Sequence, residues 1–193
     1  KAACLVVVGS GCETNLLLPP NVYGWHGGMD LPKRIDAQAP GGLAKWFSDF
    51  VRQRSGIRTT IPVPMTGSAW SSTWSQISSQ IQKGDEREGI ILYISTHGYA
   101  DEQDAYLLSD LPDIKNPAGF DASRTSFSEL LRNLKEEDIA KKNILLILDV
   151  CHAQSYWPIG MLQNDFVERL QAKYGDEIKT LPHLTVIVST SPG

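Results

Sequence analysis

The sequence predicts a three-layer αβα sandwich built around a mainly parallel β-sheet. Five short apolar runs recur along the 193 residues, at spacings that leave room for a helix between them. Each run is continuous in β-branched residues and Leu, not alternating, which is typical of strands buried on both faces. A chain of this length fits one core, so residues 1–193 are predicted to form a single domain.

The predicted strands are the five apolar runs themselves. In chain order they are Cys4–Val8, Ile57–Val63, Ile90–Ser95, Ile144–Asp149 and Leu184–Ser189. Two of the segments that connect these strands are irregular. Leu17–Gly42 is rich in Pro and Gly, and Ala153–Gln163 carries Tyr-Trp-Pro after a cysteine, so both predict loops.

Helices are predicted in the intervals between the strands. Apolar side chains share one helical face within 43–51, Ile77 and Ile81 lie one turn apart within Thr73–Ile81, and Phe166, Val167 and Leu170 share a face within Asn164–Tyr174. Ser126 followed by Glu129 forms a capping box, which opens a further helix. Every crossover thus has a helix to complete it.

Composition excludes several classes of function. The net charge of −4 gives no broad basic face, so no nucleic acid contact is predicted. The apolar run Ala2–Val8 is too short to span a bilayer, so no membrane contact is predicted. Cys4, Cys12 and Cys151 form neither a disulfide framework nor a zinc pattern, which favours a reducing, cytoplasmic compartment.

Two of the predicted strands lead directly into reactive side chains. His97-Gly98 follows Ile90–Ser95, and Cys151 follows Ile144–Asp149. Ligands of open α/β sheets bind outside the carboxyl ends of the strands, so both side chains meet at one rim if the strands are neighbours. A cysteine nucleophile needs a thiolate and a nearby imidazole base. Each residue alone is more often structural, but together they predict a cysteine-nucleophile hydrolase, with Gly98 giving room for a substrate carbonyl and an oxyanion N–H.

These motifs resemble those of a known family. Ser95-Thr96-His97-Gly98 and Asp149-Val150-Cys151-His152-Ala153 are similar to the Ser-Gly-His-Gly and Asp-Ser-Cys-His-Ser motifs of metacaspases and bacterial caspase-like peptidases. The sequence departs from them at Thr96 and Ala153, which is expected to alter the pocket rim. Weaker similarities are Leu5–Gly9, Asp36-Ala37, the strand and acidic turn Leu107–Asp110, and Val186–Gly193.

The resemblance implies an endopeptidase with a Cys151–His97 dyad that acts on proteins or peptides. Asp149 occupies the position that pairs with Arg or Lys in metacaspases, and a buried carboxylate favours such cations, so cleavage after Arg or Lys is predicted. Ser95 and Asp36 are predicted to line the same pocket, although Asp36 could equally cap a helix.

The family also implies features outside the dyad. Its members continue into a small subunit, often after self-processing, so a small-subunit chain of the same precursor is an expected partner. Metacaspases often use calcium, but Asp101, Glu102 and Asp104 lack ligand spacing and are interpreted as a solvated loop, so neither a cofactor nor a metal is predicted. Asp110 is interpreted as structural, and His26, His152 and His183 are given no role.

Two alternatives remain open from the sequence. An inactive caspase-like module for protein interaction would share the fold without the chemistry. A CHAT-type or separase-like peptidase would share the dyad with a different specificity, although Asp149 and His152 favour the metacaspase-like group.

Overall fold

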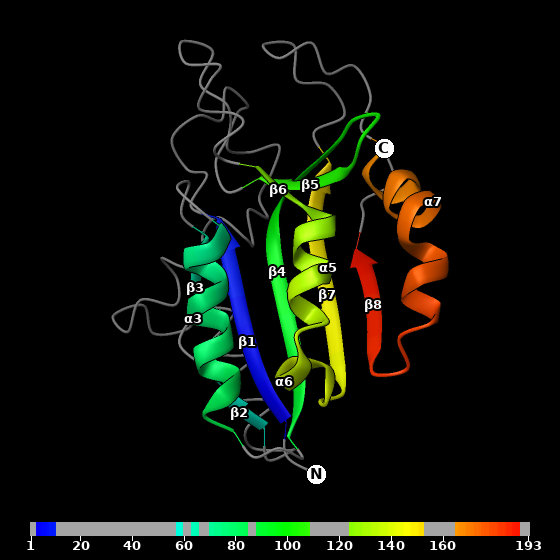
Figure 1. Cartoon of the computed structure of the whole chain (residues 1–193). Helices are drawn as coiled ribbons and strands as arrows, with labels where there is room; N and C mark the ends of the chain where they lie inside the picture. Colours follow the sequence, from blue (N-terminus) through cyan, green and yellow to red (C-terminus); the bar gives the residue numbers. More distant parts are fainter. Residues whose placement is uncertain are drawn as a thin grey trace.

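The computed structural model describes residues 3–10, 57–59, 63–65, 70–84, 88–108, 124–152 and 165–189. These residues form a mixed α/β fold in which helices pack against an eight-stranded sheet (Figure 1). The strands are β1 (Ala3–Ser10), β2 (Ile57–Thr59), β3 (Val63–Met65), β4 (Gly89–Ala100), β5 (Ala105–Leu108), β6 (Arg124–Ser126), β7 (Ile144–His152) and β8 (Leu184–Ser189). The helices are α3 (Trp70–Gln82), α5 (Phe127–Leu134), α6 (Glu137–Ala140) and α7 (Phe166–Lys179).

The centre of the sheet is parallel. Strands β1, β4, β7 and β8 lie side by side in that order and run in the same direction. The short strands β2 and β3 pair in parallel with the other edge of β1. At the far end of β4 the chain turns back, so that β5 pairs antiparallel with β4 and β6 with β5.

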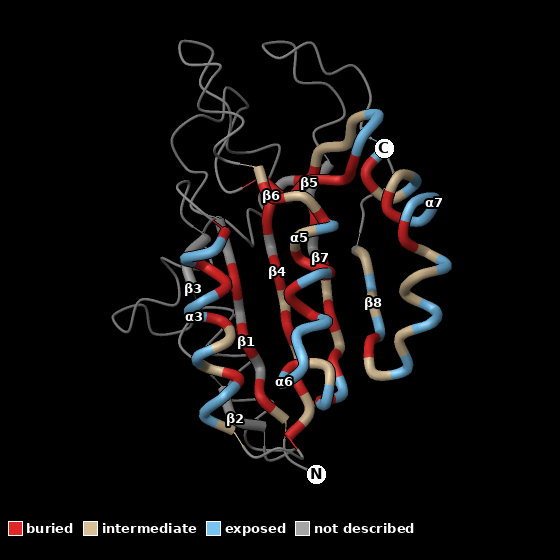
Figure 2. The backbone as a smooth tube through the Cα atoms, in the orientation of Figure 1, coloured by how far each residue is buried: buried red, intermediate tan, exposed pale blue. Residues whose placement is uncertain are grey.

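Burial alternates along the central strands (Figure 2). Even-numbered positions are buried from Ile90 to Gly98 in β4 and from Ile144 to Val150 in β7, whereas the described odd-numbered ones are intermediate, because successive side chains of a strand point to opposite faces. The sequence predicted strands buried on both faces, and the described positions of the second face are intermediate. The buried set comprises Ile90, Leu92, Ile94, Ile144, Leu146 and Leu148, joined in the core by Cys4, Val6 and Val8 of β1.

The buried face is covered by α3, α5 and α7, which lie in one row (Figure 1). Trp74 of α3 donates its indole N–H to Glu136, just after α5, over 3.0 Å. On the other side of α5, the rings of Phe127 and Tyr174 of α7 have centroids 5.0 Å apart. The strand order β1, β4, β7, β8 advances in one direction, so right-handed crossovers place all three helices on the same face.

The α/β class predicted from the sequence is confirmed, with corrections to its elements. Helices were expected at Thr73–Ile81, after Ser126 and at Asn164–Tyr174, and α3, α5 and α7 occupy those places. The strand expected at Ile57–Val63 is instead described as the two segments β2 and β3. The helix expected within 43–51 lies outside the described residues. Within the described ranges, no helix is both long and apolar enough to cross a bilayer.

Candidate functional site

The two reactive residues sit on neighbouring strands at matching positions. In the parallel ladder of β4 and β7, His97 is the register partner of Cys151, and Ser95 is the partner of Asp149. The structure thus brings together, at the level of the backbone, these four of the six predicted site residues, with Gly98 next to His97 in the same ladder. The side chains of these four lie outside what the structure describes, as does Asp36.

Both strands extend further than the sequence predicted. His97 and Cys151 were expected just past the strand ends, but β4 continues to Ala100 and β7 to His152. The reason is a change of partner: β1 pairs with β4 as far as Ser95, and β5 pairs with it from His97 onwards. His97 therefore lies in a ladder between Cys151 of β7 and Leu108 of β5.

Thr96, which stands where the family motif has Gly, has a structural explanation. It is only 5% exposed, and its hydroxyl donates a hydrogen bond to the backbone carbonyl of Leu108. Position 96 belongs to the alternate set of β4 positions that face the helices. The departure at Thr96 therefore ties β4 to β5, and its effect on a pocket rim stays a prediction.

Gly98 is required by packing on the same buried face. A Cβ at this position would lie 2.2 Å from Cγ1 of Val150 and 3.0 Å from Cδ2 of Phe166. Protein side chains therefore fill the space that the sequence analysis assigned to a substrate carbonyl. The role of its N–H as an oxyanion donor stays a prediction.

The loop joining β4 to β5 is an ordered turn, not the solvated acidic loop predicted. Asp101 accepts hydrogen bonds from the backbone N–H groups of Gln103 and Asp104, over 2.7 and 2.8 Å. Asp104 is only 5% exposed. Among the described residues, no group of three or more His, Cys, Asp or Glu side chains is placed to hold a metal ion.

Asp104 is a hub of hydrogen bonds that the sequence analysis missed. Its Oδ1 accepts from the backbone N–H of Ala105 over 2.8 Å and from the hydroxyl of Tyr174 over 2.6 Å. Its Oδ2 accepts from the hydroxyl of Ser128 over 2.9 Å and lies 3.3 Å from Nζ of Lys173. Burial alone would raise the pKa of this carboxyl, but these donors and the lysine charge outweigh burial and lower its pKa below the ordinary value.

The hairpin of β4 and β5 also carries an aromatic and basic cluster. The rings of Tyr99 and Tyr106 stack with centroids 5.9 Å apart. The guanidinium of Arg124, on β6, lies 4.7 Å from the Tyr106 centroid and 3.5 Å from the Asp101 carboxylate. Burial, and then the charge of Asp101, raise the pKa of both phenols above the ordinary value, against the opposing charge of Arg124.

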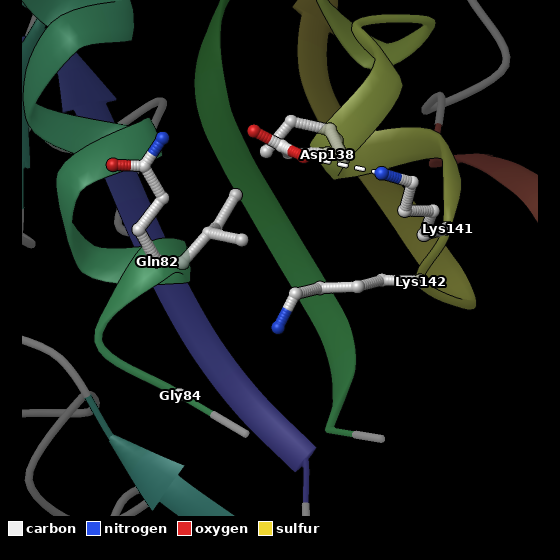
Figure 3. A pocket seen from close by; sticks show the side chains of 7 residues that line it. Gln82, Gly84, Asp138, Lys141 and Lys142 are labelled. Carbon is white, nitrogen blue, oxygen red and sulfur yellow. Dashed lines mark hydrogen bonds and ion pairs between the residues drawn. The ribbon is translucent and has the colours of Figure 1, made fainter. Parts of the chain in front are cut away.

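A pocket of about 650 Å³ lies at the other end of the molecule (Figure 3). It is lined by the end of α3 and by α6 with the residues that follow, where β4 and β7 begin. From Gly89 to His97 the strand rises about 26 Å at about 3.3 Å per residue. This pocket is therefore separate from the His97–Cys151 pair. Its lining residues are Ile81, Gln82, Gly84, Asp138, Ile139, Lys141 and Lys142.

Several residues singled out in the sequence fall outside the described part of the chain. These are Asp36, Asp110, His26 and the segment Ala153–Gln163. His183 is described and lies at the turn before β8, where its backbone carbonyl accepts a 2.7 Å hydrogen bond from the N–H of Ile144. It is therefore at the opposite end of the sheet from His97. No protein-family model matches the chain, and a search of curated proteins finds no match either.

Proposed function

We propose that this chain is a cysteine endopeptidase of caspase-like architecture that cleaves peptide bonds after Arg or Lys. The observation that carries the proposal is the register of β4 and β7, in which His97 and Cys151 are direct partners. Neighbouring strands lie about 4.8 Å apart, so a base and a nucleophile start from adjacent backbone positions. A nucleophilic cysteine needs that proximity to be activated.

The strand order supports a ligand site at this edge of the sheet. β1 has β2 and β3 on one side and β4 on the other. The chain therefore reverses its direction of travel across the sheet at β1, and ligands of open α/β sheets bind at the carboxyl ends of strands at such a switch point. His97 follows directly after the stretch of β4 that pairs with β1.

The same reversal supports a three-layer architecture. From β1 to β2 the chain moves across the sheet in one direction, and from β1 through β4 and β7 to β8 it moves in the opposite direction. The crossovers in this second direction place α3, α5 and α7 on one face. A right-handed connection in that direction would cover the other face. The proposed fold is therefore the three-layer αβα sandwich that the sequence predicts.

The proposed chemistry is acyl transfer through a thioester. The Cys151 thiolate attacks the carbonyl carbon of the scissile peptide bond, and the imidazolium of His97 donates a proton to the departing amine. His97 then accepts a proton from water, which attacks the thioester, so that the carboxylic acid is released and the Cys151 thiolate and the His97 imidazolium are restored. Backbone N–H groups at Gly98 and Cys151 are the proposed donors to the oxyanion.

Specificity for Arg or Lys is assigned to Asp149, with Ser95 beside it and Asp36 as a further lining residue. The support from the structure is that Ser95 and Asp149 are register partners, one side-chain repeat before the reactive pair. A carboxylate at this position would bind a guanidinium through two charge-assisted hydrogen bonds.

The proposal is tested with the full chain and short peptides that carry a fluorogenic amide after Arg, Lys or Asp. Cys151→Ala and His97→Ala should each abolish cleavage after Arg and Lys. Matched controls are Cys4→Ala and His183→Ala, which remove the same side-chain types elsewhere in the fold. Full turnover by either dyad variant, or no cleavage by a folded wild-type chain, would show that the function is wrong.

Specificity is tested separately with Asp149→Asn. Losing a charge-assisted pair costs about 1.5–3 kcal/mol, so the preference for Arg over an uncharged residue should fall by about 10- to 100-fold. The rate at which iodoacetamide alkylates Cys151 should change much less. If the peptide ending in Asp is the best wild-type substrate, the pocket assignment is wrong while the dyad stands.

A further inference from the structure

The Asp104 carboxylate joins three elements that approach the reactive pair. It lies at the start of β5, at the end of the turn that follows β4. Its donors from outside the hairpin are Ser128 in the first turn of α5 and Tyr174 on α7. Lys173, next to Tyr174, adds an ion pair and also donates to the backbone carbonyl of Gln103 in the turn.

Asp104 is held far more firmly than the other acidic residues of this region. It is 5% exposed, whereas Glu102 and Gln103 in the same turn are exposed. A buried carboxylate is stable only when its oxygens are paired, and here both are. Replacing it with Asn would turn one acceptor oxygen into an NH2 donor and leave either the Tyr174 phenol or the Ser128 hydroxyl without its acceptor, which is costly inside a protein.

Helix α7 connects this hub to the reactive pair. Its first residue, Phe166, lies beside Gly98, as does Val150 of β7. A Cβ at position 98 would be 3.0 Å from Cδ2 of Phe166 and 2.2 Å from Cγ1 of Val150. Gly98 follows His97 in β4, and Val150 precedes Cys151 in β7. Two helical turns later, Tyr174 binds Asp104. The same helix therefore contacts the neighbours of both reactive residues at one end and the hairpin at its middle.

We propose that Asp104 is a positioning residue for the His97–Cys151 pair, because it fixes the β4–β5 hairpin against α5 and α7. The inference rests on the proposed function and extends it. His97 lies in the ladder where β4 pairs with both β5 and β7, so a change in the angle of the hairpin changes the place of His97 relative to Cys151. Misplacement by about 1 Å can cost about 100-fold in rate.

The test compares Asp104→Asn and Tyr174→Phe with wild type, using the full chain. Both variants should lower kcat for an Arg peptide by about 10- to 100-fold while KM changes little, because the pocket residues are untouched. The matched control is Asp176→Asn, which makes the same change on an exposed part of α7. That control should keep kcat within about twofold of wild type.

A second readout separates positioning from general weakening of the fold. The pH dependence of Cys151 alkylation, followed on the Cys151 peptide by mass spectrometry, reports whether an imidazole is close to the thiol. In Asp104→Asn the midpoint pH of Cys151 alkylation should shift towards the pKa of an isolated thiol, which is about 8.5. Circular dichroism at the assay temperature establishes that each variant is folded.

The outcomes distinguish this inference from the function on which it rests. If wild type cleaves and the folded Asp104→Asn chain keeps wild-type kcat and alkylation, the positioning role is overturned and the peptidase function stands. If Asp104→Asn does not fold, Tyr174→Phe decides, because it leaves the charge and the other donors in place. If wild type cleaves none of the peptides, the function fails, and an unchanged alkylation profile in both variants overturns the positioning role independently.

Discussion

Gly98 sets how closely β4, β7 and α7 approach one another. Val150 and Phe166 occupy the space beside its Cα, so no side chain fits at this position without a shift of its neighbours. The motif predicts this glycine at a substrate-binding position, and the packing supplies an independent reason for it. The sequence around Gly98 does not indicate this packing, because the two neighbours come from distant parts of the chain.

We expect Gly98→Ala to destabilise the fold by about 1–3 kcal/mol, the usual cost of overpacking a core. The added Cβ would meet Val150 at 2.2 Å. Urea denaturation provides the measurement, and Val150→Ala in the same chain should recover part of the loss. As a control, Gly175→Ala in α7 meets only Gln171, at 3.7 Å, and should gain about 0.5–1 kcal/mol. Equal effects of the two alanines would contradict the packing described for Gly98.

Asp104 gives the fold a sensitivity to acid. Its pKa is lowered in the folded chain, because hydrogen bonds and Lys173 together outweigh the opposing effect of burial. A carboxyl with a lowered folded pKa contributes stability above its unfolded pKa, near about 3.9, and loses it as pH falls towards the folded value. The Tm should therefore fall as pH drops from about 5 to about 2.

The comparison that checks this is the slope of Tm against pH. Asp104→Asn should flatten the slope, since the amide has no proton to bind in this range. Asp176→Asn should leave it nearly unchanged, because Asp176 and Lys179 form an exposed pair whose effect is screened by solvent. A slope in Asp104→Asn as steep as in wild type would show that other carboxyls cause the acid loss.

Among the elements, helix α5 begins at the position that the capping box in the sequence predicts. Ser126 has an extended backbone and its hydroxyl accepts a 3.2 Å hydrogen bond from the N–H of Glu129, as the capping box predicts. Ser126 is both the last residue of β6 and the N-cap of α5, so the strand leads directly into the helix.

Ser126→Ala should cost about 0.5–2 kcal/mol, the range for losing a helix N-cap. Ser75→Ala, at an exposed position within α3, removes the same hydroxyl from a helix that does not depend on it and should have little effect. Thermal unfolding of the two variants beside wild type gives the answer. A loss at Ser75 as large as at Ser126 would exclude the capping explanation.

The elements that the sequence predicted best are those with a local signal. A capping residue marks α5, and the spacing of Ile77 and Ile81 marks α3. Strand ends were predicted least well, because the extension of β4 past Ser95 depends on β5 replacing β1 as its partner. No residue near His97 signals that exchange.

At the scale of the whole molecule, β4 and β7 form the centre of the sheet. β4 has β1 and then β5 on one side and β7 on the other, and β7 lies between β4 and β8. The sequence predicted where the reactive residues stand along the chain, but their pairing depended on which strands are neighbours. That order is fixed by crossovers between distant segments, so it follows from the fold and not from either motif.

Hydrogen exchange should reflect this arrangement. We expect the backbone amides of β4 and β7 to exchange most slowly, because their opening requires most of the sheet to open. Among the described strands, β6 pairs only with β5 and β8 pairs only with β7. The amides of these two strands should exchange faster than those of β4 and β7, by about an order of magnitude or more. Slower exchange in β8 than in β4 would mean that the stable centre of the molecule lies elsewhere.

The order of the strands has a consequence for how the chain folds. β1 and its partner β4 are separated by residues 11–88, whereas β4 and β7 are separated by residues 101–143 and β7 and β8 by residues 153–183. Longer loops cost more entropy to close, and contacts close in sequence form faster. Residues 89–189 should therefore assemble first and β1 should dock afterwards, so that the backbone of the reactive pair comes together before the sheet is complete.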